Sequence, residues 1–117
     1  PKPKPEPKPQ STLNKSSPLI NGVLKEVVRS PQYRESPRAP EYPRKALRRK
    51  LEGMVMIRVL VGADGANQRV IIQQSSGHEV LDQAALEAVT KWRFVPSRYA
   101  GKAVAAWVEV PVNFKLR

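Results

Sequence analysis

The side chains that carry acid–base, metal or nucleophilic chemistry are few and scattered in this sequence. His78 is the only histidine and there is no cysteine, so the sequence predicts neither a His or Cys metal site nor a Ser-His-Asp constellation. The acidic side chains of the second half show no paired spacing suited to acid–base catalysis; they are Asp64, Glu79, Asp82, Glu87 and Glu109. We expect no catalytic residue, no metal and no cofactor, and the chain is not predicted to be an enzyme.

A main-chain surface is the stronger candidate for recognition. Residues 103–114 alternate apolar and other side chains, with Ala106, Val108, Val110, Val112 and Phe114 on one face. Pro111 lies within this run, and because a proline is poorly tolerated in a central strand, we expect an edge strand. The outward N–H and C=O groups of such an edge need water, a second copy of the chain or a ligand strand. A homodimer formed by self-pairing is therefore one of the expected states.

Composition indicates one small domain with an extension. The chain has 117 residues, 21 Lys and Arg against 10 Asp and Glu, a net charge of +11, and 12 prolines, ten of them before residue 53. Residues 1–9 alternate proline with lysine or glutamate, which is typical of a polyproline II spacer. We expect residues 1–17 to be a disordered spacer end and, since the first residue is Pro1, the natural N-terminus to lie upstream.

The segment between the spacer and the domain carries a short apolar pattern. Leu19, Ile20, Val23, Leu24, Val27 and Val28 recur at three- and four-residue spacing, which favours an amphipathic helix over residues 19–28. Residues 18–36 are accordingly predicted to be an extension with one loosely attached helix, and the domain proper is predicted to span residues 37–117. Pro43 is suited to begin a second, short helix that carries Ala46 and Leu47.

The remaining elements predict an α+β fold. Residues 53–61 alternate as a strand, Asp64-Gly65 favours a hairpin turn, and residues 70–74 form the return strand. A helix beginning near His78 or Glu79 has a broad apolar face that includes Leu81, Ala85, Val89 and Trp92. With the strand at 103–114, these elements predict a three-stranded antiparallel sheet of order 2-1-3 with one long helix on one face.

The same residues resemble the C-terminal domain of the energy-transducing protein TonB. The resemblance rests on an ordered set of short motifs and on the Pro-rich spacer upstream; the motifs are Tyr42-Pro43 with Ala46, Gly53 with Val55, Asp64-Gly65, Ser75-Ser76-Gly77, Leu81-Asp82, Ala84-Ala85, Trp92-Arg93-Phe94 with Pro96, and Gly101 through Val110-Pro111-Val112 and Phe114. Asn67 departs from the pattern, because an apolar residue is usual there, and it leaves the start of the second strand open.

The resemblance implies a periplasmic module, anchored to the inner membrane by an N-terminal segment absent from this sequence and driven by an ExbB/ExbD-type complex that uses the proton-motive force. It implies binding of the TonB-box segment of outer-membrane receptors, for uptake of siderophores, haem or vitamin-type cargo. The segment would add as a strand to the third strand's free edge. The implied partner-binding residues are Val104, Ala105, Ala106, Trp107, Val108, Glu109 and Val110, with Arg38, Tyr42 and Pro43 near the receptor plug.

Two other functions compete with this interpretation. The basic run Arg44, Lys45, Arg48, Arg49 and Lys50 could neutralise phosphates, although it lacks interleaved aromatic residues and a known reader motif, so a solvated helix face is favoured and no specific nucleic acid is expected. The second competing function is that of a TolA-like structural linker between membranes, for which the same fold is expected. Trp107 has two open interpretations, packing under an N-terminal segment or a half-exposed contact at the binding edge.

Overall fold

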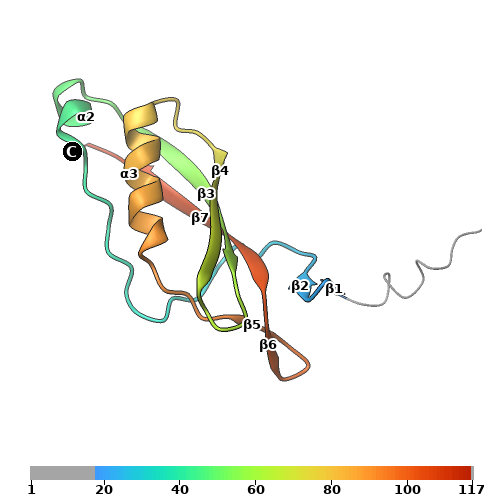
Figure 1. Ribbon diagram of the computed structural model, residues 1–117. Helices are drawn as coiled ribbons and strands as arrows, with labels where there is room; N and C mark the ends of the chain where they lie inside the picture. The colour runs from blue at the N-terminus through green and yellow to red at the C-terminus, as the bar shows by residue number, and fades with distance from the viewer. Residues whose placement is uncertain (1–17, 117) are drawn as a thin grey trace, which may run out of the picture.

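The computed structural model describes residues 18–116, so the predicted spacer at residues 1–17 lies outside the described residues. A three-stranded antiparallel sheet, in the order β4-β3-β7, forms the centre of the fold. Its strands are β3 (Gly53–Val61), β4 (Asn67–Gln74) and β7 (Ala106–Phe114). Helix α3 (Glu79–Thr90) covers one face of this sheet (Figure 1). The predicted α+β class, with an antiparallel sheet and a helix, is confirmed.

The hydrophobic core forms where the two-residue period of the strands meets the apolar stripe of α3. Alternate residues of β3 and β7 point toward α3, and they meet its i, i+4, i+8 stripe. Burial of these side chains removes apolar area from water at about 25 cal/mol per Å², so the helix and the sheet stabilise each other. The fully buried side chains of the core include Val55, Ile57, Val59, Leu81, Ala85, Val89 and Val110 at this interface, with Phe94 just beyond the helix.

Residues 19–28 do not form the predicted helix. They form a hairpin of β1 (Leu19–Ile20) and β2 (Val23–Leu24), followed by a bend at residues 25–26. Asn21 and Gly22 both have positive φ, 54° and 80°, as the tightest two-residue hairpin turn requires, and an Asn-Gly pair adopts that geometry at little cost. The turn chemistry therefore outweighs a helical stripe that is too short to be stable in water.

The last predicted strand is also divided. Val104 belongs to β6 (Lys102–Val104), which pairs with β5 (Ser97–Tyr99) in a second small hairpin, and β7 begins only at Ala106. Ala100 and Gly101 close that hairpin with positive φ values of 53° and 82°. Gly101 thus forms the turn of a separate hairpin, and the strand predicted over residues 103–114 is divided between β6 and β7.

The start of the second strand, left open because of Asn67, lies at Asn67 itself. Its side-chain amide donates to the main-chain oxygen of Trp92 at 2.9 Å, just past the C-terminal end of α3. The same amide also donates to the Val89 and Thr90 carbonyls, both at 3.4 Å, which are among the carbonyl groups that a helix end leaves without an intrahelical partner. A polar residue there ties β4 to the end of the helix, which an apolar residue could not do.

The N-terminal end of α3 is organised by Asp82. Its carboxylate accepts hydrogen bonds from the Ser76 amide at 2.9 Å, from the Ser76 hydroxyl at 2.7 Å and from the Ser75 hydroxyl. Partial burial raises the pKa of Asp82, but the hydrogen bonds from Ser75 and Ser76, with the nearby His78, outweigh burial and hold the pKa below its ordinary value.

This arrangement predicts a pH-dependent contribution to stability. Because the folded pKa is depressed, the stabilisation is present above the unfolded pKa of ~3.9 and is lost as the pH falls through the folded value. Asp82→Asn is expected to lower the free energy of unfolding by about 1 kcal/mol at pH 7, the usual net contribution of a hydrogen bond in a partly solvated site, and the difference from the wild type should vanish toward pH 2. Urea unfolding at both pH values measures it. Glu79→Gln, an exposed acid of the same helix turn, is the control and should change little; an equal loss from both variants at pH 7 would contradict the assignment.

Candidate functional site: the outer edge of β7

β7 forms one edge of the sheet and β4 forms the other, with β3 between them. Ala105, Trp107 and Glu109 turn main-chain groups to the β7 edge, and by the two-residue period of a strand Pro111 turns its nitrogen the same way. The missing N–H of Pro111 therefore costs no bond to β3. The structure explains why this strand tolerates the proline and brings most of the predicted partner-binding residues onto one strand, with Val104 and Ala105 just before it.

The N-terminal part of the chain lies along this edge. Residues 23–29, which we call the N-terminal strap, run parallel to β7 with bridges from Val23 to Ala105 and from Val28 to Val108. Three main-chain hydrogen bonds join them: Leu24 N–H to the Ala105 carbonyl at 2.9 Å, Val28 N–H to the Trp107 carbonyl at 2.8 Å, and Glu109 N–H to the Val28 carbonyl at 2.8 Å. The edge that the sequence predicted to be free is thus covered by the chain itself.

The strap pairs discontinuously. Residues 25–27 bend away between the two bridges, while the side chain of Val28 packs against the hydrophobic core. Within the described residues, the bonds to the strap engage the Trp107 carbonyl and the Glu109 amide, but not the Trp107 amide or the Glu109 carbonyl. A continuous strand in the same place would have more main-chain groups to pair with than the strap uses.

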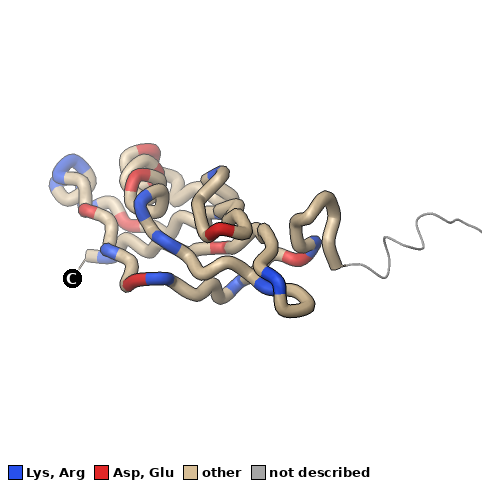
Figure 2. The backbone as a smooth tube through the Cα atoms, turned by 60° about the horizontal axis from the view of Figure 1, so that its bottom comes forward, with Lys and Arg blue, Asp and Glu red and all other residues tan. Residues whose placement is uncertain are grey.

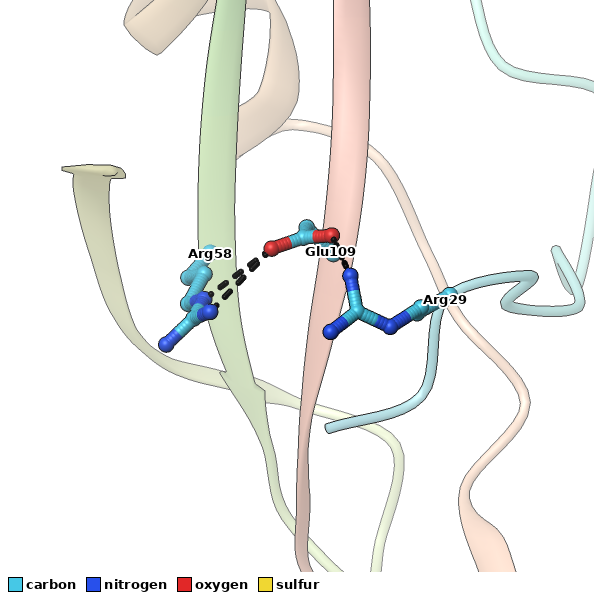
Figure 3. A network of polar contacts seen from close by, with 3 residues as sticks. All are labelled: Arg29, Arg58 and Glu109. Carbon is cyan, nitrogen blue, oxygen red and sulfur yellow. Dashed lines mark hydrogen bonds and ion pairs between the residues drawn. The ribbon is translucent and has the colours of Figure 1, made fainter. Parts of the chain in front are cut away.

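Glu109 is the charged centre of this edge (Figure 3). Its carboxylate accepts from Arg58 of β3 at 3.2 and 3.3 Å and from Arg29 of the strap at 2.9 Å. The Glu109 side chain is only 11% exposed, whereas that of Arg58 is 29% exposed and that of Arg29 is 74% exposed. Arg58 is therefore the principal partner, and the bond to Arg29 is a solvated contact of small energetic weight.

Trp107 lies at the middle of this edge, and its role in binding stays a prediction. It is half-buried, its carbonyl accepts from the strap, and the Arg69 guanidinium lies 5.9 Å from the ring centroid. An arginine over an indole face is a favourable cation–π contact. The ring thus contacts a side chain of β4 across the outer sheet face, while the main chain of Trp107 contacts the strap.

Arg38, Tyr42 and Pro43 do not join the β7 edge. They line a groove between the extended stretch 35–44 and α3. The Tyr42 ring packs edge-on against Phe114 with centroids 5.4 Å apart, and Phe114 is seven residues along β7 from Trp107, on the order of 23 Å in a strand. The predicted partner-binding residues therefore form two surfaces.

The groove is held together by aromatic side chains. The Trp92 indole donates to the Arg38 carbonyl at 2.8 Å, and the Tyr42 hydroxyl donates to the Leu51 carbonyl. Burial, with a smaller effect of the Glu52 carboxylate, raises the pKa of Tyr42, so this hydroxyl stays a donor at neutral pH. Tyr33 packs on both Trp92 and Phe94, at centroid distances of 5.8 and 5.2 Å.

The basic run lies beside this groove. Helix α2 (Arg44–Arg48) and the residues just after it present five exposed cations (Figure 2): Arg44, Lys45, Arg48, Arg49 and Lys50. Only Ala46 of the helix is buried. This exposure fits a solvated helix face and a phosphate-binding surface alike, so the preference for a solvated face stays a prediction.

The described residues contain no group of three or more His, Cys, Asp or Glu side chains that could hold a metal ion. None of the helices among residues 18–116 combines the length and hydrophobicity that a bilayer crossing requires.

The comparisons with known proteins agree with the fold and the motifs. Residues 38–116 match the family described as Gram-negative bacterial TonB protein C-terminal, and the chain belongs to this family. Over 78 residues it is 53% identical to protein tonB2 of Pseudomonas aeruginosa, covering 67% of this chain and 29% of that protein. It is 43% identical over 77 residues to protein TonB of Vibrio cholerae, covering 66% of this chain and 32% of the relative.

A solved structure is similar as well. The solution NMR structure of the Pseudomonas aeruginosa TonB C-terminal domain aligns with a TM-score of 0.59 and 29% identity, covering 82% of this chain and 94% of that one. The predicted family resemblance is confirmed. The chain spans about a third or less of the curated relatives named above, so what the whole proteins do is treated below as a proposal.

Proposed function

We propose that this chain is the receptor-binding end of a periplasmic energy-transducing protein, anchored in the inner membrane upstream and driven by an ExbB/ExbD-type proton-dependent complex. It binds the TonB-box segment of outer-membrane receptors and transmits force for uptake of siderophores, haem or vitamin-type cargo. In this proposal residues 1–17 are spacer, residues 18–36 an extension, and residues 37–117 the receptor-binding domain. Family membership supports the general role.

The site of the proposed contact is the β7 edge at Ala105, Trp107 and Glu109. The observation that carries it is that these residues already bond another segment, the strap, through their main chain at two parallel bridges. The edge is therefore geometrically competent for strand addition, in which backbone bonds supply affinity and side-chain pockets supply selectivity. Arg38, Tyr42 and Pro43 form a second contact with the receptor plug from the far end of β7.

A peptide titration tests this proposal. A receptor TonB-box peptide bound as an added strand loses a donor and its extended ladder when a central residue is replaced by proline, while alanine keeps both. Since each net backbone bond contributes about 0.5–1.5 kcal/mol, we expect central proline to weaken binding about tenfold or more and alanine at the same position to weaken it less.

Calorimetry of the two peptides, together with amide chemical shifts of the full chain, gives the measurement. Shifts should cluster on residues 105–109, whereas β4 serves as the control strand on the opposite edge. Equal costs for proline and alanine, or shifts centred on β4, would refute the β7 edge as the binding site.

A further inference from the structure

The strap and the proposed ligand compete for the same atoms. The Ala105 and Trp107 carbonyls and the Glu109 amide are bonded to residues 24 and 28 of the chain itself. An added strand on β7 needs these groups, because each strand residue turns its N–H and C=O to one edge only. The closed strap and a bound strand therefore exclude each other.

The contacts that hold the strap on β7 are few and discontinuous. The strap makes two isolated bridges separated by a bend, its only side chain against the core is Val28, and its ion pair uses the exposed Arg29. A continuous ligand strand gains the Trp107 amide and the Glu109 carbonyl in addition to everything that the strap bonds. Replacement of the strap by a ligand strand is therefore most favourable when the ligand is fully extended.

Release of the strap leaves no buried charge unpaired. Glu109 keeps Arg58, at 3.2 Å, when Arg29 departs. An uncompensated buried carboxylate would be strongly destabilising, so this second partner is what makes an open state accessible.

From this geometry, and resting on the proposed function, we infer that the N-terminal strap is an autoinhibitory strand that closes the β7 edge and must leave before a receptor segment binds. The observed affinity is then the intrinsic affinity reduced by the fraction of molecules with an open edge. This makes the extension of residues 18–36 a regulator of the site.

A reversible lock tests the inference in the full chain. Val23 and Ala105 are bridge partners, and neighbouring strands lie about 4.8 Å apart, a separation that a disulfide spans. The chain has no cysteine of its own, so Val23→Cys with Ala105→Cys forms a single crosslink. Oxidised protein should lose binding of the TonB-box peptide at least about tenfold, and reduction of the same sample, the matched control, should restore it.

A release variant gives the opposite change. Val28→Asp removes the apolar anchor of the strap and is expected to raise peptide affinity on the order of tenfold. Ile20→Asp, at a residue 53% exposed in the hairpin that precedes Val28, introduces the same charge away from the bridges between the strap and β7 and should leave the affinity unchanged. Amide hydrogen exchange at Glu109 reports directly whether the strap has opened.

The outcomes separate the two proposals. Equal affinity of the oxidised and reduced forms, with peptide shifts on β7, overturns the strap inference and leaves the binding edge standing. Absence of peptide binding in every form, although exchange at Glu109 shows an open edge, overturns the proposed function and the inference with it.

Discussion

Phe94→Ala is expected to lower the free energy of unfolding by about 3–5 kcal/mol, the usual cost of deleting a buried aromatic ring. Phe94 is fully buried and lies where the strand-like stretch at residues 93–95 meets the chain at residues 32–34. The surroundings are two β segments joined to each other, so they can collapse into the space of the lost ring only in part. Denaturant unfolding of the full chain at pH 7 measures the change.

The neighbouring Val95 provides the matched control. It is 41% exposed, although its amide donates to the Gln32 carbonyl at 2.9 Å. Val95→Ala keeps that main-chain bond and should change the free energy of unfolding by less than about 0.5 kcal/mol. A loss below about 1 kcal/mol for Phe94→Ala would contradict the placement of this ring in the core.

The same experiment bears on where the cooperative unit begins. Tyr33 packs on Phe94, and Arg34 N–H donates to the Arg93 carbonyl at 2.9 Å, so part of the predicted extension contacts the core ahead of residue 37. Residues in contact are expected to show coupled effects on stability. Tyr33→Ala and Phe94→Ala should therefore be less than additive.

Much of the fold could be predicted because burial imposes a period. The alternation of Val55, Ile57, Val59 and Val61 and the helical stripe of Leu81, Ala85 and Val89 are long enough to be unambiguous, and all seven side chains are buried. The structure of residues 19–28 could not be predicted in this way, because ten residues with apolar spacing of three and four fit a short helix or two very short strands. The Asn21-Gly22 pair was the signal that could have decided it.

The strand that forms the candidate site could be predicted from the sequence, but its coverage by the strap could not. Pro111 indicated an edge because of its missing donor, a local property of one residue. The covering strap could not be predicted, because the contact between Arg29 and Glu109 joins residues 80 positions apart and parallel pairing leaves no turn in the sequence to mark it. The central role of Glu109 was missed for the same reason: its partners Arg58 and Arg29 come from a different strand and from the extension.

Breaking the ion pair between Arg58 and Glu109 on β7 is the second change with a large expected effect on the free energy of unfolding. Arg58→Met is expected to lower the free energy of unfolding by about 2–3 kcal/mol, because it leaves the nearly buried Glu109 carboxylate with only the solvated Arg29. Methionine keeps the aliphatic stem of the arginine on the sheet, so the loss reports charge and hydrogen bonding rather than packing. Arg29→Met is the matched control and should cost less than about 1 kcal/mol.

The double variant Arg58→Met with Glu109→Met decides whether the pair itself is stabilising. Replacing both partners by apolar groups of similar volume leaves no buried charge unpaired, and such replacements are often close to neutral. We therefore expect the double variant to be more stable than Arg58→Met alone, as a double-mutant cycle from denaturant unfolding would show. Additive losses would mean that Glu109 is solvated when Arg58 is absent, and Arg58 would then not be what keeps the edge stable after the strap has left.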